Sequence, residues 1–405
     1  MEATIATAAA VVFFGILATP LILRSGAPLL LLFLGLGMLL GENGPVGIVF
    51  DDFELAYQLG SIALAVILFS GGMETQMPDV RRALAPALAL ATVGVCMTAG
   101  ILGGLASLIL GIPIATALLL GAVCGSTDAA ATFLLLQQNR IGLAGRTRPT
   151  ILLESGLNDP IAIFLTLVLI SVVDGGPHGL GLGTVAIFAK EMGVGAAAGI
   201  AGGLGLAYLV NRVPLLPGLF PVLVLMGGLM LFGATAGLGG SGFLAVFLCG
   251  VMVSDRATRA LPNIVDFLAG MAWISQIGLF LMLGLLVTPA TLPRDFGAGI
   301  AAAILLIFVA RPIAVITCLA PLGFPFRQQL YIGWMGLRGA VPIFLATLPV
   351  ISPGPVDVDF FNEVFIVVIV SLFVQGWTVA PAARLLKVQT PEETERTENP
   401  EVEKV

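Results

Sequence analysis

Long apolar runs, separated by short polar or glycine- and proline-containing segments, dominate the pattern along the chain. A helix needs about 20 apolar residues to span the hydrocarbon core of a bilayer, and turn residues or charges mark where one span ends. On this basis we expect about thirteen transmembrane helices. Their expected ranges are 4–23, 28–41, 56–73, 83–110, 113–138, 149–173, 184–211, 217–238, 241–254, 266–289, 296–321, 328–348 and 361–384.

Composition supports the same fold class. Hydrophobic residues make up 58% of the 405 positions and charged residues only 10%, whereas a soluble domain carries about 25% charged residues. Most of the surface must therefore face lipid, and we expect an all-α membrane protein with the bilayer as its surroundings. No nucleic acid partner and no cofactor are expected.

The charges outside these spans predict the orientation. If each span crosses once, one face collects most of the basic residues and the other face most of the acids. We expect the protein in the cell (inner) membrane with its basic face in the cytoplasm. This orientation places the N-terminus outside and the C-terminus inside. The basic face holds Arg24, Arg81, Arg82, Arg140, Arg146, Arg148, Arg212, Arg256, Arg259, Arg327, Arg384 and Lys387.

The character of the chain changes after residue 388. We predict a transmembrane domain over residues 1–388 and a disordered, acidic cytoplasmic tail over residues 389–405, because the last segment is rich in acids and contains no aromatic residue.

Two expected helices share a local pattern that suggests an internal repeat. The segment from Gly125 aligns with the segment from Gly336, and a second pair of matches, from Phe33 and from Phe247, lies at a similar separation. The fifth and twelfth helices are an odd number apart, so they cross in opposite directions. This is the arrangement of an inverted repeat in which glycine- or proline-interrupted helices meet at the midplane of the membrane.

Five charged residues fall inside expected spans, where a charge costs on the order of 3 kcal/mol and indicates function. They are Asp128, Glu154, Asp159, Arg311 and Arg338. In the sixth helix Ser155 and Asp159 are separated by four residues, and so are Glu154 and Asn158, so each pair shares a face. One carboxylate among neutral oxygens suits a desolvated alkali cation.

Some of these charges also fit a structural role. We expect Glu154 to pair with Arg338, because an unpaired arginine at mid-membrane is hard to tolerate. Arg311, which precedes Pro312, is expected to be structural as well. Asp128 fits either a structural or a functional role. Asp159 is the carboxylate left to bind a cation or a proton.

Three motifs resemble a known family. Residues 126–131 (STDAAA), 154–160 (ESGLNDP) and 336–342 (GLRGAVP) are similar to the NhaP-type branch of the cation:proton antiporter superfamily, and within it to bacterial potassium/proton antiporters. The resemblance covers residues 1 to about 388. It implies thirteen helices with broken helices five and twelve crossing, a core bundle, a dimerisation bundle and a homodimer.

The resemblance also implies roles for individual residues. Asp159 would bind the ion or the proton in turn, Ser155 and the backbone of Thr127 would complete the shell of the alkali cation, and Asp128 and Asn158 would brace the site. Glu154 and Arg338 would match the buried pair of the family. Ser70 stands where relatives often carry an acid, which puts a contribution from the third helix in doubt. The large cytoplasmic regulatory domains of many potassium/proton relatives are not among these residues, so a regulatory domain or nucleotide would belong to a part outside this sequence.

The expected function is secondary active exchange of a monovalent cation for a proton. A partly desolvated carboxylate binds protons at ordinary pH, so cation and proton compete for one charge. Because Asn158 is neutral, one cation is expected to exchange for one proton without net charge movement. Potassium is favoured, with sodium as the alternative. A cation channel would need rings of repeated ligands around a pore, and an organic-anion symporter would be repelled by the interior acids.

Overall fold

The computed structural model describes residues 9–19, 29–42, 44, 46–128, 131–132, 135–136, 141–143, 145–174, 181–287, 289–354 and 356–389. Within these ranges the regular secondary structure is helical, apart from two isolated β-bridges. Eight helices are long and apolar enough to cross a membrane, and the described residues contain four shorter apolar helices. The predicted all-α class with membrane-spanning helices is confirmed. The predicted tail from residue 390 onward lies outside the described residues.

The helices begin and end close to the edges of the apolar runs. The first is Ala9–Thr19. The others are α2 (Leu29–Leu40), α3 (Phe53–Glu74), α4 (Met77–Ala89), η1 (Leu90–Gly94), α5 (Val95–Leu110), α6 (Ile114–Val123), α8 (Thr147–Val173), α9 (Leu182–Arg212), α10 (Leu219–Gly237), α11 (Gly242–Arg256), α12 (Leu261–Leu285), α13 (Leu292–Leu305), η2 (Leu306–Ala310), α14 (Arg311–Leu319), η3 (Ala320–Leu322), α15 (Phe326–Trp334), α16 (Ala340–Ile351) and α17 (Val358–Leu386).

Local signals account for several helix ends. The Asp52 carboxylate accepts a hydrogen bond from the backbone N–H of Leu55 (2.8 Å) and caps α3, and the Ser241 hydroxyl caps α11 in the same way. Such side chains satisfy backbone donors that the first helical turn leaves free. α5 ends at Gly111, whose φ of +70° is accessible to glycine at low energy.

Two long helices are each interrupted by a π-helical segment. One runs over Met77–Leu110 and contains η1, and the other runs over Leu292–Leu322 and contains η2. η1 contacts α14 and η2 contacts α5, so the two helices pack along one another. Single π-helical turns of this kind are frequent at functional sites.

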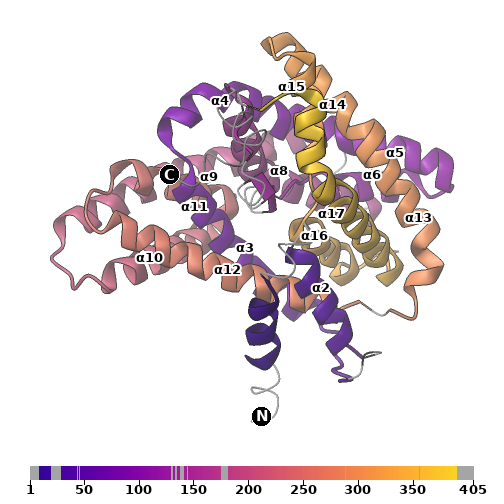
Figure 1. The fold of residues 1–405 in the computed structure, drawn as a ribbon, viewed down its shortest axis with the longest axis horizontal. Coiled ribbons are helices and arrows are strands. Elements are labelled where there is room, and N and C mark those ends of the chain that lie inside the picture. Colours follow the sequence, from indigo (N-terminus) through magenta and orange to yellow (C-terminus); the bar gives the residue numbers. More distant parts are fainter. Residues whose placement is uncertain are drawn as a thin grey trace, which may run out of the picture.

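The helices form two groups with α3 and α8 between them. Figure 1 shows α9, α10 and α12 on one side and α5, α13 and α17 on the other. α3 contacts α11, α12 and α16, while α8 contacts α4, α6, α11 and α16. In the most apolar window of α8, 72% of the residues are buried, against 33% in α9 and in α10. α8 is therefore interior, and the outer helices expose apolar faces.

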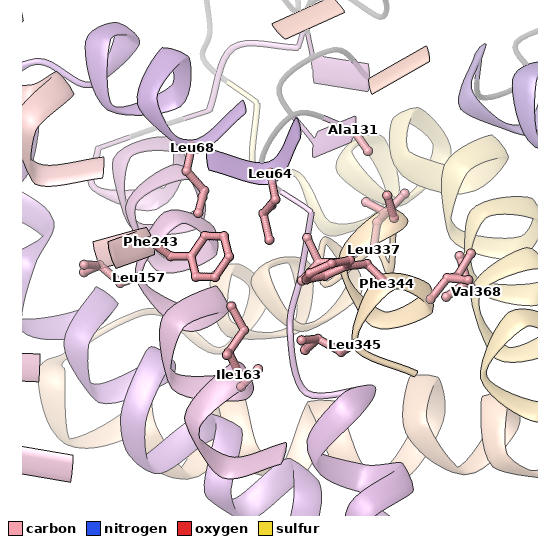
Figure 2. Close-up of a cluster of buried hydrophobic side chains, with 14 of the residues drawn as sticks. Leu64, Leu68, Ala131, Leu157, Ile163, Phe243, Leu337, Phe344, Leu345 and Val368 are labelled. Atoms are coloured by element: carbon pink, nitrogen blue, oxygen red, sulfur yellow. The ribbon is translucent and has the colours of Figure 1, made fainter. Parts of the chain in front are cut away.

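The core lies where these groups meet. In Figure 2, Leu64 and Leu68 of α3 lie near Phe243 of α11 and Phe344 of α16, and all four side chains are buried. Close packing at this point depends on a glycine in α8: a Cβ atom on Gly156 would lie 2.3 Å from the ring of Phe247. The small residue lets α8 and α11 approach, as is common where helices pack in membranes.

Candidate functional site

The site is built around two interruptions in the helices. α6 ends at Val123, and residues 124–128 are not helical. α15 ends at Trp334, and α16 begins only at Ala340. We refer to residues 124–128 as the first break and to residues 335–339 as the second break. The break within the expected 113–138 span and the one within the expected 328–348 span both lie where glycine and polar residues interrupt the apolar pattern.

The two breaks contact each other directly. The backbone N–H of Asp128 donates to the carbonyl of Leu337 (3.0 Å), and Nη1 of Arg338 donates to the carbonyl of Ser126 (2.6 Å). A helix end leaves backbone groups without intrahelical partners, and inside a membrane such groups must be satisfied by protein. Each break thus satisfies backbone groups of the other.

A cluster of oxygens, in two hydrogen-bonded groups, lies where the first break meets the part of α8 that carries Asp159. The hydroxyl of Ser126 donates to Oδ1 of Asp159. The hydroxyls of Thr127 and Ser155 are hydrogen-bonded to each other (2.9 Å), and Nδ2 of Asn158 donates to the Thr127 hydroxyl (2.6 Å). These five side chains are each at most 3% exposed. The structure therefore brings together Thr127, Ser155, Asn158 and Asp159, which the sequence analysis selected.

Asp128 lies at the contact between the breaks. Its Oδ1 accepts a hydrogen bond from the backbone N–H of Ala131 (2.9 Å), in the manner of a helix N-cap. Its carboxylate also packs against Gly339, where an added Cβ atom would lie 1.6 Å from Oδ2. Asp128 thus contacts the second break through both its backbone and its side chain.

The predicted ion pair between Glu154 and Arg338 is wrong, because the partner of Glu154 is Arg311. Glu154 binds Arg311 through two contacts, Nη1–Oε1 and Nη2–Oε2, both 2.8 Å long. Such a bidentate pair matches the planar fork of a guanidinium to a carboxylate. Arg338 lies within the second break and donates instead to a carbonyl that the first break leaves free. Both arginines are mid-span, so their positions in the sequence could not distinguish the two partners.

A cavity of about 240 Å³ reaches the oxygen cluster. Asp128 and Asp159 line its inner part, while Glu74, Asp79 and Arg148, at the ends of α3, α4 and α8, line its outer part. Its walls are largely apolar and include Leu64, Leu68, Phe247, Leu279 and Phe280. Carboxylate, hydroxyl and amide oxygens that lie at the inner end of such a cavity or next to it are the ligand chemistry preferred by hard cations.

Sequence reasoning missed several residues that this geometry places at or near the site. Ser126 belongs to a motif that was singled out, yet only the fold shows that its hydroxyl reaches Asp159. Ser70 of α3 and Gln276 of α12 line the cavity, so α3 does contribute to its wall. The sequence did contain a signal for Gln276, because it is a polar side chain inside an otherwise apolar span. Such a side chain is costly in lipid, so its presence indicates a specific role.

Comparisons with known proteins show which proteins this chain is similar to. The family model "Sodium/hydrogen exchanger, transmembrane" matches residues 9–385. The chain is 46% identical over 378 residues to the K(+)/H(+) antiporter NhaP2 of Shewanella sp. (strain ANA-3), covering 93% of this chain. It is 44% identical over 379 residues to the K(+)/H(+) antiporter NhaP of Alkalimonas amylolytica, covering 94% of this chain. The match spans 66% of the length of each of these two relatives.

More distant proteins show the same relationship. The Na(+)/H(+) antiporter ApNhaP of Aphanothece halophytica is 27% identical over 353 residues, which cover 82% of this chain and 66% of that protein. The solved structure of the sodium proton antiporter MjNhaP1 from Methanocaldococcus jannaschii at pH 8 superposes with a TM-score of 0.79 at 23% identity, covering 95% of this chain and 99% of that chain. This structural likeness shows a shared fold.

Proposed function

Because the chain belongs to the sodium/hydrogen exchanger family, we propose that it exchanges a monovalent cation for protons at Asp159. The observation that carries the proposal is the position of this carboxylate. It is buried, it accepts a hydrogen bond from Ser126, it lies beside the Thr127, Ser155 and Asn158 oxygens, and it lines a cavity. The chain uses no cofactor in this exchange, and its transported species are K⁺ or Na⁺ and H⁺.

The exchange follows from competition for one negative charge. With a proton bound, Asp159 is neutral, and with a cation bound, the site is neutral as well. An empty, ionised site would carry an uncompensated charge through a low-dielectric region, which is costly. Only the loaded forms then change their exposure between the two sides of the membrane, and cation movement is coupled to proton movement.

Potassium is the proposed cation. The two relatives with 44–46% identity are named K(+)/H(+) antiporters, whereas the relative named a Na(+)/H(+) antiporter is 27% identical. Hydroxyl, amide and carboxylate oxygens serve both ions, so sodium is the alternative that the transport assay must separate from potassium.

The proposed placement in the inner membrane has thirteen crossings, with the N-terminus outside and the C-terminus in the cytoplasm. The fifth and twelfth crossings are the interrupted helices of an inverted repeat, and they cross where the two breaks are hydrogen-bonded. The π-helical segments η1 and η2 support this repeat, because they occupy corresponding positions in two long helices. A division of residues 1–388 into a core bundle and a dimerisation bundle, and a homodimer, complete the proposal.

The cavity supports access from the cytoplasmic side. Its outer residues Glu74, Asp79 and Arg148 lie at the same helix ends as Arg81 and Arg146, and the excess of arginine at these ends favours the cytoplasm. We therefore assign this conformation to the inward-facing part of the transport cycle.

Transport by purified protein in liposomes tests the proposed function. An imposed K⁺ or Na⁺ gradient, each applied separately, should change the internal pH of the vesicles. Asp159→Asn should abolish this change, because it removes the exchangeable charge at nearly constant volume. Asp266→Asn, which alters an exposed carboxylate on α12, is the matched control and should exchange normally. Undiminished exchange by Asp159→Asn would show that another residue binds the ions.

The stoichiometry makes a second prediction. Asn158 is neutral, so one turnover trades one cation for one proton, and the rate should not respond to an imposed membrane potential. A solid-supported-membrane recording on the unmodified protein measures this directly. A sustained current that scales with turnover would contradict one-for-one exchange, even if Asp159 remains essential.

A further inference from the structure

α17 makes polar contacts with the second break and with the residue that precedes it. Two side chains on one face of α17, Ser371 and Gln375, are separated by one helical turn and are at most 1% exposed. Polar side chains at such depth in an apolar helix are costly unless they are hydrogen-bonded to other groups. Ser371 is bonded to the second break, and Gln375 is bonded to the residue just before it.

The two side chains satisfy backbone groups on both sides of this break. Nε2 of Gln375 donates to the carbonyl of Trp334, the last residue of α15 (2.8 Å). The backbone N–H of Arg338, just before α16, donates to the hydroxyl of Ser371 (3.0 Å). Without these partners, a donor and an acceptor freed by the break would remain buried and unsatisfied, each at considerable cost.

A hydrogen bond between Ser371 and Gln375 fixes the direction of both contacts. The Ser371 hydroxyl donates to Oε1 of Gln375 (2.5 Å), so it has a lone pair left to accept from Arg338. With Oε1 occupied in this way, Nε2 of Gln375 faces the Trp334 carbonyl. The pair acts as a polar clamp that holds the end of α15 and the approach to α16 at a set separation.

The same chain of hydrogen bonds continues to the ion-binding carboxylate. Arg338, whose backbone is held by Ser371, donates through Nη1 to the carbonyl of Ser126. Ser126 donates through its hydroxyl to Asp159. Gln375, Ser371, Arg338, Ser126 and Asp159 are thus linked consecutively across four separate parts of the chain: α17, the second break, the first break and α8.

From this continuity we infer that Ser371 and Gln375 are positioning residues for the exchange at Asp159. The inference rests on the proposed function of that site. Neither residue touches the cation. The clamp sets the position of Arg338, which sets the position of the first break and therefore of the Ser126 hydroxyl. That hydroxyl stabilises the ionised form of Asp159, the form that binds a cation in competition with protons.

Transport kinetics in liposomes test this inference. Ser371→Ala and Gln375→Leu should each raise the apparent KM for the cation about fivefold, the factor given by the net contribution of one buried hydrogen bond. Protons should then compete up to a higher pH, and the midpoint of the activity profile should move by about half a unit to the alkaline side. The maximal rate should stay within about twofold, because no group that binds the ion is removed.

Thr378→Val is the matched control. Thr378 lies on α17 next to this clamp and accepts a hydrogen bond from the indole N–H of Trp334 (3.0 Å), outside the chain that leads to Asp159. This variant should leave the cation KM and the pH midpoint unchanged. If these side chains only help α17 to pack, all three variants should lose thermal stability alike, and neither the cation KM nor the pH midpoint should change.

Gln375→Glu decides the question if Ser371→Ala and Gln375→Leu do not yield folded protein. Its protonated side chain can make both hydrogen bonds of the glutamine, while the ionised form cannot donate to the Trp334 carbonyl. The rise in KM should therefore occur only at high pH, and an unchanged KM across the pH range would overturn the inference. The inference would also be overturned if the unmodified protein is active and every variant has the same cation KM and pH midpoint as Thr378→Val. An unmodified protein that exchanges neither K⁺ nor Na⁺ would overturn the proposed function itself.

Discussion

The two breaks have the same position relative to their helices but opposite chemistry. The first break carries three consecutive polar residues, Ser126, Thr127 and Asp128, of which the first two direct hydroxyls to residues of α8. The second break carries two glycines and Arg338. One break supplies oxygens, and the other supplies space and positive charge. The difference shows that two interrupted helices in one chain can contribute different chemistry: the first break contributes oxygens to the proposed ion site, and the second contacts the first break and supports it.

The glycines of the second break are where this space is needed. A Cβ atom on Gly336 would lie 2.6 Å from Nε of Arg311, and one on Gly339 would overlap the carboxylate of Asp128. The second break contains one buried arginine, Arg338, and is therefore in contact with the other, Arg311, and with the first break. The sequence of the second break is restricted by the side chains that surround it, whereas the sequence of the first break is restricted by its hydrogen bonds to α8 and, in the proposed function, by the bound ion.

The largest loss of stability should come from variants that break the ion pair between Glu154 and Arg311. A variant of Arg338, which is not in this pair, serves as the comparison. Glu154→Gln or Arg311→Met leaves one member of a buried ion pair without the other, which typically costs about 3–5 kcal/mol. The double variant should lose less than the sum of the two losses. Combining Glu154→Gln with Arg338→Met should depart less from additivity than the pair of Glu154 and Arg311, because Arg338 makes its direct hydrogen bond to the carbonyl of Ser126 and not to Glu154. Thermal unfolding in detergent measures all of these, and additivity for Glu154 with Arg311 would contradict the ion pair.

A smaller but still severe effect is expected when the space beside Asp128 is filled. Gly339→Ala would place a methyl group 1.6 Å from Oδ2 of Asp128, so one of the breaks must move. Overpacking of this kind costs about 1–3 kcal/mol, and exchange should be almost lost because Asp128 and its neighbours shift together. Gly104→Ala, at a position in α5 with nothing within 4 Å of the new atom, is the control. Comparable transport by the two variants would show that the contact between the breaks can relax.

The mildest effect is expected from removing one oxygen of the first break. Ser126→Ala deletes the hydroxyl that donates to Asp159 and leaves the backbone carbonyl that Arg338 binds. One net hydrogen bond is worth about 1 kcal/mol. We therefore expect a severalfold higher apparent KM for the cation with stability nearly unchanged. A normal KM measured in liposomes would mean that this hydroxyl does not favour the ionised carboxylate.

Much of the fold followed from hydrophobic patterning because a membrane span must be long and apolar. The exceptions have physical causes. We expected a helix from residue 83, but α4 begins at Met77, since Pro78 is well suited to a first turn and the exposed Arg81 and Arg82 need no apolar surroundings. The 113–138 span was expected to be interrupted, and α6 ends at Val123. The exact ends of the break did not follow from hydropathy, because they depend on hydrogen bonds to a distant segment.

The sequence predicted which residues form the site better than it predicted the hydrogen bonds and ion pairs between them. Asp159, Ser155 and Asn158 follow from helical spacing on one segment, and Thr127 from the adjoining motif. The partner of Glu154, the hydrogen bond from Ser126 and the roles of Ser371 and Gln375 depend on contacts between residues that lie far apart in the sequence. Only the packing of helices determines which of two buried arginines meets a given carboxylate.

The π-helical segment η2 limits how the length of this chain can vary. η2 ends at Ala310, and Arg311 follows at once. One residue advances an α-helix by about 100° of rotation. A π-helical turn holds about one residue more than an α-helical turn, so deleting a single residue within 306–310 would give regular α-helical winding and leave the guanidinium of Arg311 directed toward Glu154. Inserting one residue directly before Arg311 would instead turn the guanidinium away by about 100°. The segment is therefore the one place in this helix where the loss of a residue would preserve the ion pair.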